Sequence, residues 1–188
     1  MTARAQAGDR SETERRFEEL YRRHEARVLG YALRRAPVDA AKDAVSETFL
    51  AAWRRFDELP PDPLPWLIGA TRRTLANQRR SSARQLLLIE RLAREPVREV
   101  SSREEGTTSV VDAFAQLAAA DQELLALVAW DGLTTAQAAA SLGCSAVAFR
   151  VRLHRARHRL AAGLARASAA SQPEVAREQQ VPKAKEAP

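Results

Sequence analysis

Residues 133–160 read LTTAQAAASLGCSAVAFRVRLHRARHRL, and this stretch decides the fold expected for the second half of the chain. Thr134 is placed to cap a short helix, and Gln137, three residues later, is placed to complete a capping box. Gly143 can leave that helix with a positive φ, and a second helix is expected from Ser145. A short helix, a glycine turn and a longer helix at this spacing predict a helix-turn-helix.

The second helix of this motif divides into an apolar stripe and a basic remainder. Its apolar side chains recur at steps of three and four residues, at Phe149, Leu153, Ala156 and Leu160. Residues 145–166 contain six arginines and no acidic residue. Positive charge concentrated on one helix favours entry into a DNA groove. An arginine-rich, solvated helix at the end of a bundle is the alternative.

Length and composition point to a helical protein with a polyanionic partner. A chain of 188 residues has room for one medium or two small domains, and its abundant alanine and leucine favour helices. The net charge is +6, the pI is about 10.3, and 27 of the 30 basic residues are arginine. Arginine suits bidentate contacts to phosphate and guanine.

Several classes of function are disfavoured. The sequence has no P-loop, no dinucleotide-binding glycine pattern and no nucleophile elbow, so we expect neither an enzyme nor a cofactor. His154 and His158 lie four residues apart, but the arginines between them would repel a cation, so no metal site is expected. Cys144 has no disulfide partner. With neither a signal peptide nor a membrane span in the sequence, we expect a cytoplasmic protein without membrane insertion.

The patterning predicts an all-α fold with two small helical domains. Pro37 separates two apolar-striped helices in the first half, and the stretch after residue 94, with Pro96 and Gly106, is typical of a linker. Beyond about residue 167 large apolar residues almost disappear, which is typical of disorder. The expected organisation is a disordered tail (1–11), a first domain (12–84), a linker (85–109), the helix-turn-helix domain (110–166) and a second disordered tail (167–188).

The first domain contains an aromatic and basic stretch around a proline-rich loop. Trp53, Phe56 and Trp66 bracket a segment with four prolines, and arginines follow on the next helix. Aromatic rings beside arginines suit melted nucleic acid, where bases stack and phosphates need countercharge. Burial of both tryptophans in the core is the alternative, and the loop and the arginines would still be free to bind DNA.

These motifs carry a family resemblance. The segments DAVSETFLAAW (43–53), PWLIGATRR (65–73) and NQRR (77–80) together resemble region 2 of sigma-70 initiation factors, in the extracytoplasmic-function group. The segments LGC (142–144) and RVRLHRAR (150–157) resemble region 4 of the same group. The resemblance covers residues 14–84 and 110–165, in the order of that family.

The resemblance implies three binding surfaces. One would dock on the clamp helices of the largest subunit of the RNA polymerase core, through Asp43, Ser46, Glu47, Leu50 and Arg54. The second would recognise and open the minus-10 promoter element, through Asp57, Leu59, Trp66, Arg72, Arg73, Asn77 and Arg80. The third would read the minus-35 element, through Ser145, Ala148, Arg150, Arg152, His154, Arg155 and Arg157.

Within the third surface, Arg150 and Arg152 are the expected base readers and Arg157 a phosphate anchor. The sequence departs from the family pattern at Ser46, where Gln is common, and at Val147 and Ala148, where Gly and Thr often open the recognition helix. Ala148 offers only apolar contact, for example with a thymine methyl group.

The sequence therefore predicts a sigma factor that binds core polymerase and promoter DNA and directs initiation without being an enzyme. Family members are commonly held inactive by an anti-sigma protein, which is a further partner that the resemblance implies. One alternative is an autonomous helix-turn-helix regulator, which would normally bind DNA as a dimer. A second is a helical adaptor that does not bind DNA and whose arginines are only solvated.

Overall fold

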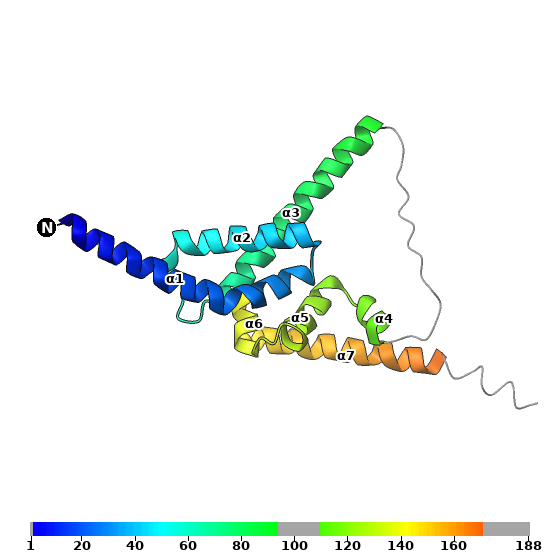
Figure 1. Cartoon of the computed structure of the whole chain (residues 1–188). Coiled ribbons are helices and arrows are strands. Elements are labelled where there is room, and N and C mark those ends of the chain that lie inside the picture. Colours follow the sequence, from blue (N-terminus) through cyan, green and yellow to red (C-terminus); the bar gives the residue numbers. More distant parts are fainter. Residues whose placement is uncertain (1, 94–109, 171–188) are drawn as a thin grey trace, which may run out of the picture.

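A computed structural model describes the backbone of residues 2–93 and 110–170 and the side chains of residues 11–84 and 110–168. Every regular element in these ranges is helical, which confirms the predicted all-α class (Figure 1). The first module, which contains the proline loop, comprises α1 (Thr2–Leu33), α2 (Val38–Arg54), the 3-10 turn η1 (Phe56–Glu58) and α3 (Leu64–Ala93). The second module comprises α4 (Val110–Ala115), α5 (Ala119–Ala129), α6 (Thr135–Leu142) and α7 (Ala146–Ala170).

The first module buries one face of each of its three helices. Aromatic and aliphatic side chains such as Tyr31, Phe49 and Leu67 fill the space between α1, α2 and α3. Two polar side chains lie in this core, and their hydroxyl oxygens, Thr48 Oγ1 and Thr71 Oγ1, are 3.0 Å apart. Both oxygens also lie within hydrogen-bond distance of a backbone carbonyl one turn earlier, so the two buried threonines are not left unsatisfied.

The second module contains the predicted helix-turn-helix in α6 and α7. The side chain of Thr134 accepts a hydrogen bond from the Gln137 amide at 3.2 Å, and Gln137 Oε1 accepts one from the Thr134 amide at 3.0 Å. The capping box is therefore confirmed. Gly143 has φ of +67°, which confirms the predicted left-handed turn. Phe149, Leu153 and Ala156 are buried, so the apolar stripe of α7 forms the core contact.

Helix boundaries differ from expectation at the ends of the modules. Residues 2–11, expected to be disordered, continue α1, because Ala, Arg and Gln propagate a helix once the packed part has nucleated it. Likewise α3 runs through 85–93, expected as linker, and α7 runs through 167–170. Residues 94–109 and 171–188 lie outside the described residues. The density of prolines predicts that Pro65 belongs to the loop, but it lies in the first turn of α3. A missing N–H at this point costs no intrahelical hydrogen bond.

None of the helices in the described ranges combines the length and apolar character that a membrane crossing requires.

The two modules are in contact, and a cluster of charges joins them. Arg35, two residues after the end of α1, donates through Nε to Glu123 at 2.8 Å and through Nη2 to Asp131, also at 2.8 Å. Its guanidinium lies over the Tyr31 ring, 3.7 Å from the centroid. Tyr31 donates to Glu123 at 2.9 Å, and Arg34 forms a second ion pair with Asp131. The side chain of Asp131 is only 2% exposed, so this cluster is largely shielded from water.

The pKa values in this cluster favour the observed pairing. Burial raises the pKa of Tyr31, and the nearby Glu123 carboxylate raises it further, so the phenol keeps its proton and acts as a donor. Burial alone would lower the pKa of Arg35, but Tyr31, Glu123 and Asp131 outweigh it, and the pKa is raised. Arg35 is therefore held as a cation between the modules.

A second contact requires a glycine. Gly69 of α3 lies against α6, and a Cβ atom at this position would be 2.8 Å from the backbone carbonyl oxygen of Ser141. That separation is shorter than van der Waals contact, and a backbone oxygen cannot swing away as a side chain does. On the same side, Gln137 donates to Asp62 of the proline loop at 2.9 Å. The helix-turn-helix and the proline loop are thereby joined.

We expect Gly69→Ala to separate the modules while each keeps its own core, since Ala favours the helical state of α3. The measurement is the inter-module distance by fluorescence energy transfer, together with the radius of gyration by small-angle scattering. Gly163→Ala is the matched control, because a Cβ there would lie 3.8 Å from the Ala113 side chain, an ordinary contact. An equally compact Gly69→Ala protein would contradict the expectation.

Candidate nucleic-acid interface

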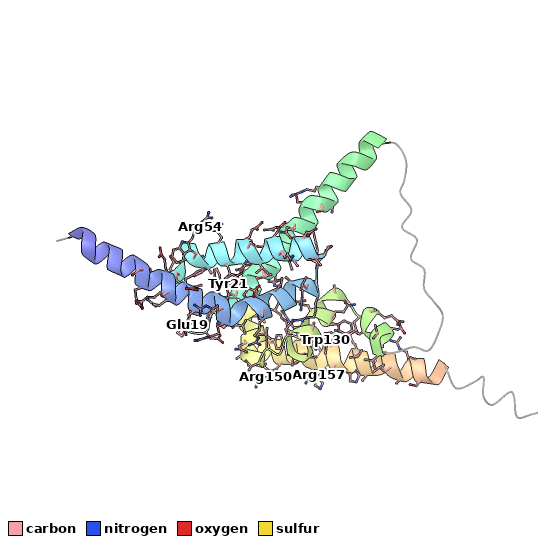
Figure 2. All side chains as sticks on the ribbon, in the orientation of Figure 1. Glu19, Tyr21, Arg54, Trp130, Arg150 and Arg157 are labelled. Atoms are coloured by element: carbon pink, nitrogen blue, oxygen red, sulfur yellow. The ribbon has the colours of Figure 1, made fainter. Side chains whose placement is uncertain are left out.

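The basic face of α7 is open to solvent. Figure 2 shows Arg150 and Arg157 along the side of α7 that faces away from α1, α2 and α3. The remaining expected minus-35 residues on this helix, Arg152, His154 and Arg155, are also exposed. Ser145 is exposed as well, and its hydroxyl accepts a hydrogen bond from the Ala148 amide at 3.1 Å, so it caps the helix. Ala148 is half-buried.

Helical period places the expected base readers on different flanks. Each residue advances the helix by about 100°, so Arg150 and Arg152 point about 160° apart. Arg157, two turns after Arg150, lies on the same flank as Arg150. A helix in the major groove presents its two flanks to opposite walls of the groove. Arg150 and Arg152, which the sequence predicts together as base readers, therefore face opposite walls.

One arginine of α7 is engaged inside the module. Arg159 donates through Nη1 to both carboxylate oxygens of Asp121, at 2.7 and 3.0 Å. Asp121 lies in the first turn of α5 and its residue is 7% exposed. Arg159 therefore neutralises a buried acid, whereas other arginines of α7 face solvent. No residue close to Arg159 in the sequence signals this difference in role.

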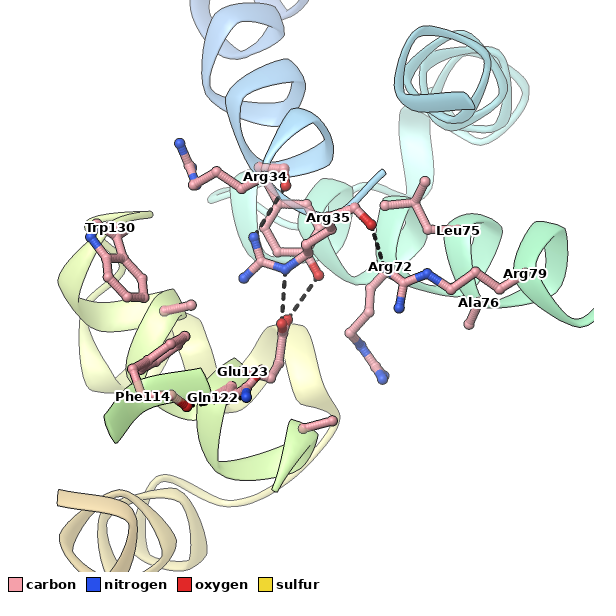
Figure 3. Close-up of a pocket in the computed structure, with 13 residues that line it drawn as sticks. Arg34, Arg35, Arg72, Leu75, Ala76, Arg79, Phe114, Gln122, Glu123 and Trp130 are labelled. Atoms are coloured by element: carbon pink, nitrogen blue, oxygen red, sulfur yellow. Dashed lines mark hydrogen bonds and ion pairs between the residues drawn. The ribbon is translucent and has the colours of Figure 1, made fainter. Parts of the chain in front are cut away.

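The residues expected at the minus-10 element divide between two surfaces. Arg73, Asn77 and Arg80 are exposed and lie with Trp66 along one stripe of α3. Arg72 instead lines a cavity of about 640 Å³ between the modules, beside Arg35 and Arg79 (Figure 3). Its Nε is buried without a hydrogen-bond partner. Arg72 lies about 100° around α3 from Arg73, so it is outside the stripe.

Asp57 and Leu59 belong to the segment before α3, where a second cavity opens. This cavity of about 330 Å³ lies between α1 and the proline loop, and Phe56, Leu59, Pro60, Pro61 and Pro63 form its loop side. Arg16, Glu19, Arg23 and His24 are among the residues on its α1 side. Burial lowers the pKa of His24, and Arg23 lowers it further, although Asp62 opposes this.

The sequence left open whether Trp53 and Trp66 are exposed for base stacking or buried in the core, and the structure places both in between. Trp53 is 37% exposed and meets Phe17 edge to face, with ring centroids 5.0 Å apart. Trp66 is half-buried and packs against the core. Neither tryptophan is fully buried.

The expected polymerase-docking residues share one exposed face of α2. Asp43, Ser46, Glu47, Leu50 and Arg54 are all exposed and fall within an arc of about 100°. The opposite side of α2 is buried through Ala44, Thr48 and Ala52. Leu50 is 49% exposed, which gives this face an apolar centre between charges. Arg54 in Figure 2 marks the end of this face, on the side of the molecule opposite α7.

In the described part of the chain, no group of three or more His, Cys, Asp or Glu side chains is arranged to hold a metal ion.

Comparisons with known proteins agree with this arrangement of two modules. Residues 20–85 match the family model described as Sigma-70 region 2, and residues 108–160 match that described as Sigma-70, region 4. The RNA polymerase sigma factor NccH of Alcaligenes xylosoxydans xylosoxydans is 32% identical over 160 residues, which are 78% of this chain and 85% of NccH. The ECF RNA polymerase sigma factor SigL of Mycobacterium tuberculosis is 32% identical over 144 residues, 72% of this chain and 81% of SigL.

A solved structure also matches. CnrH, in complex with the cytosolic domain of CnrY, superposes with a TM-score of 0.55 at 29% identity. The match covers 80% of this chain and 88% of CnrH.

The pairing of Arg159 with Asp121 leads to a prediction about stability. We expect Arg159→Ala to lower the free energy of unfolding by about 1–2 kcal/mol, because a buried carboxylate loses a charged donor that is itself partly solvated. Arg157→Ala on the same helix is the control and should leave stability unchanged while weakening binding to duplex DNA. Thermal unfolding and low-salt gel shifts measure the two effects. Equal stability of both variants would contradict the assignment.

Proposed function

This chain belongs to the sigma-70 family of RNA polymerase sigma factors, in the extracytoplasmic-function group, and we propose that it works through three separate surfaces. The exposed face of α2 binds core polymerase. The stripe of α3 and the proline loop act at the minus-10 element. The exposed face of α7 binds the minus-35 element.

The observation that carries this proposal is the face of α2. Its five exposed residues serve no packing role in the structure described, and they combine two carboxylates, an apolar side chain and an arginine on one arc. Such a mixture is typical of a protein-binding surface, where an apolar centre is surrounded by charge. An autonomous DNA-binding regulator has no need of a second surface of this kind in a separate module.

Promoter binding requires the modules to move apart. The names of the two elements place them about 25 base pairs apart, which is roughly 85 Å of duplex at 3.4 Å per base pair. In the structure, α3 and α6 are in contact at Gly69 and Ser141. The α3 stripe and α7 therefore reach both elements only after the inter-module contacts are released. The linker between them then allows two weak contacts to reinforce each other.

The proline loop supports a role in strand opening. Pro60 and Pro61 are exposed at the rim of a cavity that also has an aromatic wall, Phe56, with Arg16 lying 5.3 Å from its ring centroid. Stacking on an aromatic ring and countercharge for phosphate are the two features that unpaired nucleotides need. Prolines reduce the conformational entropy that the loop loses when it is held against a flipped base.

Regulation by another protein is part of the proposal. CnrH was solved with the cytosolic domain of CnrY, which supports an anti-sigma partner for this chain. A partner that binds the modules in contact would keep them from spanning a promoter. The protein itself catalyses no reaction in this scheme, and its site of action is the cytoplasm, with core polymerase and promoter DNA.

The docking face should be separable from folding. Asp43→Arg with Glu47→Arg should abolish co-purification with core polymerase, since both side chains are exposed and such reversals rarely unfold a helix. The matched control is Glu18→Arg with Glu19→Arg on α1, which makes the same change in charge at exposed positions. Circular dichroism checks the fold. Retention of polymerase by the folded double variant of α2 would refute this docking face.

The loop should act at the opening step. Pro60→Gly with Pro61→Ser leaves the buried Leu64 in place and should reduce transcription from duplex promoters by roughly 4- to 30-fold, because each lost proline adds loop entropy worth about 0.4–1 kcal/mol. A template melted in advance at the minus-10 element should largely restore the yield.

Permanganate reactivity of promoter thymines reports the bubble directly in this experiment. Pro37→Ser, outside the loop, is the control. Parental activity of the loop variant on duplex DNA would exclude the opening role, and failure of the parent to form a bubble with core polymerase would count against the whole function.

A further inference from the structure

Two valines on α7 are exposed where the rest of its large apolar side chains turn inward. Val147 is 60% exposed and Val151 is 46% exposed. They are four residues apart, so they lie one above the other on one face of the helix. In the described part of α7, Phe149 and Leu153 are buried, and the two remaining leucines are half-buried. The valines therefore form an apolar pair that no contact among the described residues explains.

This pair lies at the crest of the helix. At about 100° per residue, Val147 and Val151 each point about 160° away from the buried Phe149, directly outward from the module. Arginines stand on both sides of them. Arg150 and Arg157 lie on one flank, and Arg152 and Arg155 on the other. The result is a narrow crest between two rows of cations, apolar at Val147 and Val151 near the N-terminus of the helix and continued by the exposed His154 and His158.

The chemistry of this crest fits the major groove of DNA. The two rows of arginine match the two phosphate backbones that border the groove. The apolar group that base pairs present in the major groove is the 5-methyl group of thymine. A protein partner would need carboxylates on both sides of a strip only two side chains wide, whereas duplex DNA supplies negative charge on both sides as a matter of geometry.

We propose that Val147 and Val151 read thymine methyl groups in the minus-35 element. The inference rests on the proposed function, and it names the chemical feature that this helix selects. Ala148, the residue expected from the sequence to make this contact, is half-buried and lies to one side of the crest, with its amide bonded to Ser145. The valines, and not Ala148, reach the floor of the groove.

The test begins with selection of active promoters by the holoenzyme from a library randomised over the minus-35 element. Each thymine of the selected sequence is then replaced singly by deoxyuridine, which lacks only the 5-methyl group. At one or two positions we expect the holoenzyme to bind about fourfold more weakly, the fold-change that corresponds to about 0.8 kcal/mol for one methyl-sized group.

The same replacements in variants assign the contact to a side chain. With Val147→Ala or Val151→Ala, the difference between thymine and uracil at one position should fall close to onefold, because the partner of the methyl group is gone. Val111→Ala, at a valine of α4 that is 72% exposed, should keep the parental difference. Thermal unfolding confirms that the variants are folded.

The possible outcomes distinguish a failure of this inference from a failure of the proposed function. If the parent binds thymine and uracil templates equally at every position, the methyl contact is overturned while transcription still supports the sigma function. A loss in the valine variants that is equal on both templates also overturns it, because the crest would then affect DNA binding without reading the methyl group. Absence of any transcript from the library would instead refute the proposed function.

Discussion

The position of Arg35 between two carboxylates is the interaction on which the arrangement of the modules depends. Its side chain is 11% exposed and carries a charge that has left most of its water, so Glu123 and Asp131 must both stay in place to offset the desolvation. Both acids belong to the second module. The modules therefore hold their mutual orientation through this charge cluster together with the packing of α3 against α6 at Gly69.

The contact between the modules limits how far apart the two modules lie. It does not cover the exposed face of α2 or the exposed face of α7. Exposed residues of α2 and α7, such as Arg54 and Arg150, lie on opposite sides of the molecule (Figure 2), and neither takes part in the Arg35 cluster. Arg72 is different, because it lines the cavity between the modules and its Nε lacks a partner there. Separation of the modules would expose Arg72 to solvent.

The same residue type has several roles here, and its neighbours decide which. Arg35 joins the modules, Arg159 neutralises the buried Asp121, and Arg150 faces solvent. A sequence dominated by arginine conceals this division, since spacing along one helix shows which side chains share a face and not which acid from another helix meets them. The sequence pattern of α7 therefore does not identify Arg159 as the partner of a buried acid.

Local patterns determined the helices, the capping box of Thr134 and Gln137, the left-handed Gly143 and the exposed arc of α2, because each depends on residues within a few positions of one another. The family resemblance added the roles expected of each surface. Only the tertiary structure decided that Gly69 meets Ser141, that Arg72 lines a cavity between the modules, and that Arg159 pairs with Asp121. All three depend on contacts between segments far apart in the chain, and periodicity within one segment carries no information about such contacts.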